Sequence, residues 1–395
     1  MLNKKMYELG SNRSAIRDLF EYGKTLAQKI GSENVFDYTL GNPSVPCPNE
    51  VNDYICDLVK TNAVQTHGYT SAQGDLATRV AICDYNKKRY GFSLDENLIY
   101  MTCGAAAALT IVLKSIISSP SEEVIAFAPY FPEYKVFVEN ASATLKAVPA
   151  DEVNFETNFE MLSEIISANT QAVIINSPNN PSGTVYSKQT IQKLAEFLSS
   201  KQKEYGHPIY LIADEPYREI LFDGAECPYL PCYYDNTIIC YSYSKALSLP
   251  GERIGYIAIS PNCENAKDLY FAVCGAGRSL GYVCAPSLFQ KVVAKYASAT
   301  SDPSIYKDNR DELISMLKNL GFECVNPKGA FYLFMKSPIP SAKEFSEYAK
   351  TLGLLLVPSD TFGVNGYVRL ATCVSKETVK NSQKAFEKLA NHYFK

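Results

Sequence analysis

The chain has 395 residues, of which 38 are basic and 42 are acidic, so its formal net charge is −4. This length allows a large core and two or three compact units. The near balance of charge excludes a global positive field that would hold nucleic acid or an anionic membrane, and small-molecule chemistry is the better expectation.

From the sequence we expect neither a targeting signal nor a metal site. Residues 1–23 carry charges throughout, and no window reaches 18 uninterrupted apolar residues, so we expect a cytoplasmic protein without membrane contact. The 12 cysteines are scattered with no Cys-x-x-Cys pair, which favours reduced thiols. The three histidines lie far apart, so we predict no metal site and no Ser/His/Asp triad.

In chain order, residues 1–41 show no strand pattern, and we expect this segment to pack with the C-terminal part of the chain. Residues 42–285 are predicted to form the large domain, because short β-rich runs alternate with helical stretches. The runs are 97–101, 123–127, 143–148, 172–176, 208–213, 237–242 and 253–260. This alternation predicts an α/β fold with a mostly parallel, doubly wound sheet. Residues 187–206 have the apolar spacing of a crossover helix.

From residue 286 to 395 the pattern changes, and a smaller α+β domain is predicted. Amphipathic helices are expected at 288–301 and 304–321, followed by strands near 330–335, 354–359 and 367–372. No internal repeat or heptad series is visible, which disfavours a repeat scaffold.

Polar residues follow several of the predicted strands, at the edge where open α/β sheets bind ligands. Asp214, Asn180 and the stretch 242–245 follow three of the strands, and 104–107 follow another. Each residue alone is also typical of an ordinary turn. Together they would supply an anion site, a carboxylate, an amide and a lysine, a set that suits a phosphorylated aromatic aldehyde.

The anion site is predicted at the helix that begins in 103–116. Its free N–H groups and dipole suit a phosphate, and the small residues Gly104, Ala105 and Ala106 allow close approach. An ordinary alanine-rich helix start is the alternative reading. The hydroxyl groups of Ser242 and Ser244 and the guanidinium of Arg253 would add hydrogen-bond donors. These residues flank Lys245 in the chain.

With these residues in place, the chain resembles the class I/II aminotransferases of the fold type I pyridoxal phosphate enzymes, which are aspartate aminotransferase-like. The resemblance covers nearly the whole chain. Its most specific pieces are "SPNNPSG" at 177–183, "ADEPY" at 213–217, and "SYSK" at 242–245, whose lysine is followed eight residues later by the arginine of "GERIGY". The resemblance implies this fold, pyridoxal 5'-phosphate as cofactor, and a homodimer with shared active sites.

The resemblance also assigns roles to residues. Lys245 would form a Schiff base, the aldimine, with pyridoxal phosphate and then carry the proton between the substrate Cα and the cofactor. Asp214 would pair with the pyridine nitrogen, and Tyr217 and Asn180 would hydrogen-bond the ring oxygen. Arg253 would hold the phosphate with the help of the serines.

Further roles follow from the same resemblance. Arg369 would grip the substrate carboxylate by a two-pronged contact, with the Gly41 backbone close by. Phe131 would stack on the cofactor ring, although a core aromatic residue explains it almost as well. Tyr69 would reach the phosphate of the neighbouring subunit, with a plain loop tyrosine as the alternative. The stretch 275–286 would belong to the same interface, and its glycine spacing does not fit a dinucleotide fingerprint.

The predicted reaction is amino-group transfer between an L-amino acid and a 2-oxo acid. Aspartate and aromatic or aliphatic amino acids are all candidate donors. Arg278 is the nearest candidate for a second carboxylate-binding arginine, but the resemblance places Leu280 at the family position. The alternatives are a carbon–sulfur β-lyase of the same fold and a non-catalytic binding protein, against which the intact Lys245, Asp214 and Arg369 speak.

Overall fold

The computed structural model describes residues 2–11, 15–151 and 155–394. Its main feature is a seven-stranded sheet with the strand order β2-β8-β7-β6-β5-β3-β4. The strands from β4 to β7 run parallel, and β8 runs antiparallel to both of its neighbours. The mostly parallel, doubly wound sheet is confirmed. The strands are β2 (Ile99–Thr102), β3 (Glu123–Phe127), β4 (Thr144–Val148), β5 (Thr170–Asn176), β6 (Tyr210–Asp214), β7 (Thr237–Ser242) and β8 (Gly255–Ile259).

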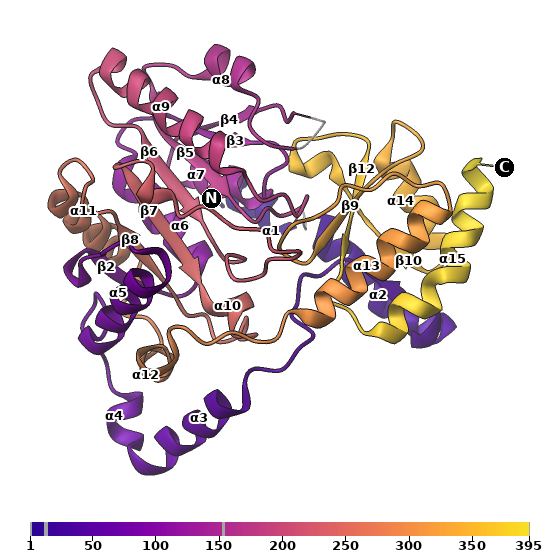
Figure 1. The fold of residues 1–395 in the computed structure, drawn as a ribbon, viewed down its shortest axis with the longest axis horizontal. Helices are drawn as coiled ribbons and strands as arrows, with labels where there is room; N and C mark the ends of the chain where they lie inside the picture. Colours follow the sequence, from indigo (N-terminus) through magenta and orange to yellow (C-terminus); the bar gives the residue numbers. More distant parts are fainter. Residues whose placement is uncertain (1, 12–14, 152–154, 395) are drawn as a thin grey trace.

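Helices cover both faces of this sheet, which agrees with the apolar residues that fill its central strands (Figure 1). On β5, Val173 and Ile175 join one buried cluster, whereas Ala172 and Ile174 join the cluster on the opposite face. The helices of this region are α3 (Asn49–Thr61), α4 (Ala63–His67), α5 (Leu76–Tyr90), α6 (Ala105–Ile116), α7 (Glu133–Asn140), α8 (Phe159–Ile165), α9 (Lys188–Tyr205), α10 (Tyr243–Ala246), α11 (Ala266–Ser279) and α12 (Ser287–Tyr296).

The predicted crossover helix is confirmed as α9. The Ser187 side chain accepts a hydrogen bond from the N–H of Thr190 and caps the helix start. Gly206 ends the helix in the left-handed conformation with φ 75°, which glycine adopts without steric cost. The predicted helix at 288–301 is shorter in the structure, since α12 ends at Tyr296.

A second region holds the C-terminal helices and two small sheets, at the right of Figure 1. A three-stranded antiparallel sheet has the order β11-β12-β9, and β1 pairs with β10. The predicted strand at 354–359 is divided between these two sheets. The elements are β9 (Tyr332–Lys336), β10 (Leu354–Leu355), β11 (Val357–Pro358), β12 (Tyr367–Ala371), α13 (Ser304–Asn319), α14 (Ala342–Thr351) and α15 (Lys376–Phe394).

The N-terminal segment contains α1 (Lys4–Ser11), α2 (Ala15–Ile30) and β1 (Phe36–Asp37). Because β1 pairs with β10 and α2 contacts β10 and β11, this part of the segment packs against the second region. The domain limits at 41/42 and 285/286 stay predictions. Short 3-10 helices complete the chain: Ser32–Asn34, Glu96–Leu98, Leu230–Cys232 and Ser359–Phe362.

Two further expectations concern the cysteines and membrane contact. All 12 cysteines lie within the described residues and are free, in agreement with reduced thiols. Within the same residues, none of the helices combines the length and apolar character needed to cross a membrane.

Candidate active site

A cavity of about 280 Å³ lies between the carboxyl ends of the central strands and the strands β9 and β12. It brings together all the sequence-predicted site residues except Gly104 and Tyr69. The predicted residues in its lining are Gly41, Ala105, Ala106, Phe131, Asn180, Asp214, Tyr217, Ser242, Ser244, Lys245, Arg253 and Arg369. Sequence reasoning missed the other lining residues, which are Ile16, Leu109, Asn176, Pro216, Pro250 and Tyr332.

Lys245 lies on α10, the short helix that follows β7. Its Nζ donates a hydrogen bond to the carbonyl oxygen of Gly41 at 2.6 Å. Burial lowers the pKa of this amine to about 8; Cys373 opposes the shift, and the charges of Arg253 and Arg369 add to it. A larger fraction of the amine is therefore uncharged near neutral pH than in water, and only the uncharged amine attacks a carbonyl group.

Asp214 ends β6 and is buried. Tyr134 donates a hydrogen bond to its Oδ2 at 2.5 Å, and Asn176 Nδ2 donates to its backbone oxygen at 2.8 Å. Burial raises the pKa of the carboxyl group to about 7, the Tyr134 contact lowers it, and Glu215 adds to the rise. Among the described residues, its Oδ1 has no hydrogen-bond partner. This oxygen is placed to accept an N–H of a bound group, which would stabilise the ionised form.

An anion site lies where α6 begins. Gly104 precedes the helix with φ 85°, and a Cβ atom there would lie 2.7 Å from Nη2 of Arg253. The Nη1 atom of Arg253 donates to Ser244 Oγ at 3.2 Å, and the hydroxyl groups of Ser242 and Ser244 are 2.8 Å apart. Helix N–H groups, two hydroxyl groups and an exposed guanidinium thus face one place, which suits a phosphate.

Arg369 lies in the middle of β12 and is only 2% exposed. Its Nη1 donates to Asn180 Oδ1 at 3.0 Å and its Nη2 donates to Thr39 O at 2.5 Å, whereas Nε has no partner among the described residues. These partners are uncharged oxygens. Because a buried charge without a counter-ion is costly, a carboxylate ligand would complete this guanidinium.

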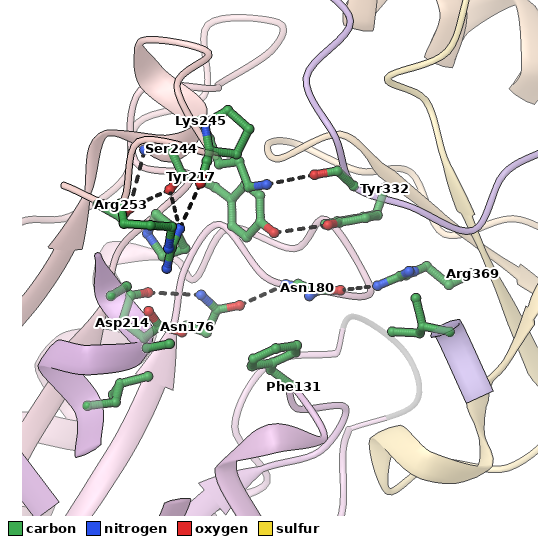
Figure 2. Close-up of a pocket in the computed structure, with 18 residues that line it drawn as sticks. Phe131, Asn176, Asn180, Asp214, Tyr217, Ser244, Lys245, Arg253, Tyr332 and Arg369 are labelled. Atoms are coloured by element: carbon green, nitrogen blue, oxygen red, sulfur yellow. Dashed lines mark hydrogen bonds between the residues drawn. The ribbon is translucent and has the colours of Figure 1, made fainter. Parts of the chain in front are cut away.

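A row of hydrogen bonds links the two halves of the cavity (Figure 2). It runs from Asp214 through Asn176 to Asn180, whose backbone N–H donates to Asn176 Oδ1 at 2.8 Å, and from Asn180 to Arg369. Asn176 is the last residue of β5, just as Asp214 is the last residue of β6. The strand-end rule that predicted Asp214 could therefore also have predicted Asn176. These hydrogen bonds therefore fix the distance between Asp214 and Arg369.

Tyr332 was missed because it begins β9 instead of following a strand. Its hydroxyl group is 2.9 Å from that of Tyr217, and Figure 2 shows the pair beside Lys245. A Cβ atom at Gly41 would lie 1.8 Å from Tyr332 Oη, so only glycine lets the 41 backbone approach here. Tyr134 was also missed, since it lies on α7 and reaches Asp214 only through the tertiary fold.

Three other predicted residues have clear positions. Phe131 is half-buried in the lining and packs edge-on against Tyr134, with ring centroids 5.8 Å apart. Tyr69 is 90% exposed and does not line the cavity of its own chain. Arg278 lies on α11 and lines a different hollow, together with Ala72 and Val283. Residues 275–279 are helical, which agrees with the rejection of a dinucleotide fingerprint. The roles assigned to the site residues stay predictions.

Comparison with known proteins gives the class of enzyme that the resemblance in the sequence implies. The family model "Aminotransferase class I and II" matches residues 33–386. The chain is 28% identical to the aspartate aminotransferase of Pyrococcus horikoshii, covering 95% of this chain and 94% of that protein. It is 28% identical to aromatic-amino-acid aminotransferase 2 of Thermococcus litoralis, with 96% of both chains covered. A crystal structure of an amino transferase from Eubacterium rectale is 53% identical, covers 100% of both chains and has a TM-score of 0.98.

The fold is thus an α/β architecture whose cavity holds Asp214 at the end of β6, Lys245 on α10 and the buried Arg369 of a neighbouring sheet. The chain belongs to the class I and II aminotransferase family. It is a fold type I enzyme of the aminotransferase class, and aminotransferases of this kind use pyridoxal phosphate.

Proposed function

We propose that this enzyme binds pyridoxal 5'-phosphate in the described cavity and transfers the amino group of an L-amino acid to a 2-oxo acid. The observation that carries this proposal is one cavity that holds a lysine with a pKa of about 8, an anion site, and a buried carboxyl group whose Oδ1 has no hydrogen-bond partner in the part of the chain that the structure describes. When bound, the cofactor would supply an aldehyde that reacts with the amino group of an amino acid and a ring that accepts electrons.

Each residue of the cavity would then have a separate task. Arg253 and the start of α6 hold the phosphate, and Asp214 accepts the N–H of the pyridine ring. Lys245 offers an amine that gains and loses a proton near neutral pH, so it can move the proton of the substrate Cα. Arg369 binds the substrate carboxylate through its guanidinium fork and so orients the Cα toward Lys245.

Substrate choice is proposed from relatives and from the cavity lining. The curated relatives include enzymes named for aspartate and for aromatic amino acids, so both classes are candidate donors. Beyond Lys245, Arg253 and Arg369, the side chains that line the cavity carry no cation, and Ile16, Leu109 and Phe131 among them are apolar. Since Arg278 of the same chain lines another hollow, we propose that it does not bind the substrate of its own chain.

We also propose a homodimer in which Tyr69 reaches the phosphate site of the partner. Its 90% exposed side chain supports this arrangement, as does the 67% exposed Val283, which lines a hollow with Ala72 close to Tyr69 in the chain. Sedimentation analysis should give twice the chain mass. Tyr69→Phe should weaken cofactor binding without changing that mass, because it removes only the hydroxyl group. The cytoplasmic location stays a prediction.

The deciding experiment is a donor screen with purified protein, pyridoxal phosphate and 2-oxoglutarate. Glutamate formation from aspartate or from aromatic or aliphatic amino acids is expected, and the visible absorbance of the bound cofactor should fall as each good donor is added alone. Release of pyruvate and ammonia from cystathionine without any 2-oxo acid would instead select the β-lyase. Borohydride reduction followed by peptide mapping should place the cofactor on Lys245.

A further inference from the structure

Two segments that end in the cavity are paired with each other. The Tyr217 segment (217–223) follows β6, and the Tyr332 segment (327–332) leads into β9; their tyrosine hydroxyl groups are 2.9 Å apart. The two backbones form an antiparallel bridge between Leu221 and Gly329. Two backbone hydrogen bonds of 2.9 Å flank it, from Phe222 N–H to Lys328 O and from Ala330 N–H to Ile220 O. The register of this short pairing therefore sets where the two hydroxyl groups lie.

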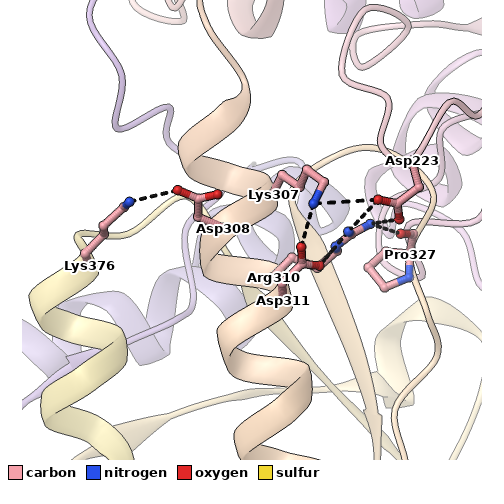
Figure 3. Close-up of polar contacts among 7 residues, drawn as sticks. All are labelled: Asp223, Lys307, Asp308, Arg310, Asp311, Pro327 and Lys376. Atoms are coloured by element: carbon pink, nitrogen blue, oxygen red, sulfur yellow. Dashed lines mark hydrogen bonds and ion pairs between the residues drawn. The ribbon is translucent and has the colours of Figure 1, made fainter.

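Arg310 of α13 binds the far ends of both segments (Figure 3). Its Nη1 and Nη2 atoms donate to the two carboxylate oxygens of Asp223 at 2.8 and 3.2 Å, and Nη1 also donates to the backbone oxygen of Pro327 at 3.0 Å. The guanidinium lies 4.7 Å from the ring centre of Phe222. One side chain thus joins the last residue of the Tyr217 segment to the first residue of the Tyr332 segment.

The chemistry of this contact requires arginine. The Arg310 side chain is only 3% exposed, so its charge needs partners, and its planar fork meets both oxygens of one carboxylate. A lysine has a single charged nitrogen and could not bind both ends with the same geometry. The Arg310 contact also lowers the pKa of Asp223, so the pair stays ionised near neutral pH.

A second carboxylate beside Arg310 provides an internal comparison. Asp311 accepts hydrogen bonds from Nε and Nη2 of Arg310 at 2.8 and 2.5 Å. It is 47% exposed, against 36% for Asp223, and therefore has a similar solvent environment. However, Asp311 lies on α13 next to Arg310 and cannot join the two segments.

The same helix also contacts the chain around the paired strands β9 and β12. The Tyr306 ring packs on Phe331 with centroids 5.2 Å apart. Asn309 Nδ2 donates to Thr372 O at 2.9 Å and to Val374 O at 2.8 Å, directly after the strand that carries Arg369. The first half of α13 therefore supports the cavity wall, and Arg310 is one of its charged contacts, beside Lys307, whose Nζ lies 3.7 Å from Asp223 Oδ1.

We propose that Arg310 is a positioning residue of the aminotransferase reaction: by binding Asp223 and Pro327 it fixes the register of the two segments and so places Tyr217 and Tyr332. Because these hydroxyl groups act only when cofactor and substrate occupy the cavity, this role rests on the proposed function. Arg310 itself touches neither the cavity nor its ligands.

The first test measures hydrogen–deuterium exchange of the cofactor-free protein. Arg310→Met keeps an unbranched side chain over the Phe222 ring but removes the fork, and Asp223→Asn removes the carboxylate. Both should speed exchange in peptides that contain the Phe222 and Ala330 amides. The contact of Arg310 with Asp223 and Pro327 is called the junction below. Asp311→Asn and Lys376→Met are matched controls, because Asp311 binds Arg310 without joining the segments and Lys376 pairs with Asp308 of α13 at 2.8 Å, away from the junction (Figure 3). Both controls should exchange like wild type at these amides.

The second test uses the enzyme loaded with pyridoxal phosphate. Arg310→Met and Asp223→Asn should lower kcat/KM on the order of tenfold, since small displacements of positioned groups are costly, whereas the two controls stay within about twofold. The pH midpoint of the visible cofactor absorbance should shift in the same direction as in Tyr217→Phe. A merely structural role would lower stability without moving this midpoint.

The results of these tests distinguish failure of the Arg310 role from failure of the proposed function. Wild-type exchange at Phe222 and Ala330 in Arg310→Met, or an unchanged kcat/KM in both junction variants, would overturn the role of Arg310. Should Arg310→Met fail to fold, Asp223→Asn decides by the same measurements, because its side chain is partly exposed. A wild-type protein that bound pyridoxal phosphate but transferred no amino group would refute the proposed function, while the exchange data would still report on the junction.

Discussion

The cavity has two walls that were built in different ways. On the wall of the seven-stranded sheet, Asp214 and Lys245 lie where strands end, so the backbone leaves the sheet and exposes polar side chains to the cavity. On the opposite wall, Arg369 lies in the middle of β12 and Tyr332 at the start of β9. The comparison teaches that one wall carries its reactive groups at the end of a strand and on the short helix that follows a strand, whereas the other holds its recognition group inside a strand.

The largest expected effect is on the first wall, where Lys245→Ala removes the proton-carrying amine. We expect the amino-group transfer rate to fall by on the order of 10⁴, the upper range for a lost general acid–base group. Rapid-mixing measurement of a single half-reaction checks this. Lys245→Arg is the matched variant, because it keeps the charge but cannot lose its proton, and it should be equally slow. Wild-type turnover in either variant would contradict the assignment.

Asp214→Asn tests the same wall through its carboxylate. The amide keeps the shape and can still contact Tyr134, but it cannot supply a negative charge to the bound ring. We expect kcat to fall by on the order of 10²–10³, as for the loss of one preorganised electrostatic partner. Tyr134→Phe is the companion variant and should have a smaller effect of the same sign. Equal rates for wild type and Asp214→Asn would remove this residue from the site.

Arg369→Lys tests the second wall and should be less severe. The lysine keeps the charge but loses the fork, so kcat/KM should fall by roughly tenfold to a hundredfold, mainly through a higher KM for the amino acid. Steady-state kinetics with several donors separate the two constants. If KM stayed at the wild-type value while kcat fell, Arg369 would act in the chemical step instead of in recognition.

The smallest effect is on stability and depends on pH. The folded pKa of Lys245, about 8, lies below its ordinary value of 10.5, so the unfolded chain binds more protons between these values. Its burial therefore costs most below pH 8, and stability recovers as the pH rises toward 10.5. In the cofactor-free protein, Lys245→Met should raise the free energy of unfolding by roughly 1–2 kcal/mol at pH 7. Chemical denaturation at several pH values checks this.

The control for that measurement is a lysine outside the cavity. Lys384 is exposed on α15. Lys384→Met should leave the free energy of unfolding and its pH dependence close to wild type. A gain in Lys245→Met that stayed constant from pH 7 to 10.5 would show that shape, and not burial of the charge, causes it.

Much of the sheet wall could be predicted because its determinants are local in the chain. Apolar runs such as 172–176 and 208–213 predict buried strands, and a polar residue directly after such a run must lie at the ligand-binding edge of the sheet. The positions of Asp214 and Lys245 followed from this rule. Family resemblance was needed for Arg369, since an arginine inside an apolar strand has no local pattern that says what it binds.

By itself, the sequence determined the α/β architecture, the strands that end at the cavity and the aminotransferase family. The reason is that the alternation of β-rich and helical stretches and the short motifs depend on residues that are close together in the chain. Only the tertiary structure decided that Tyr134 reaches Asp214, that Tyr332 meets Tyr217 and Gly41, and that Arg310 joins Asp223 to Pro327. Most of these contacts join residues 80 or more positions apart, and Arg310 and Pro327 are 17 apart but lie on different elements; no local preference of the chain fixes such distances.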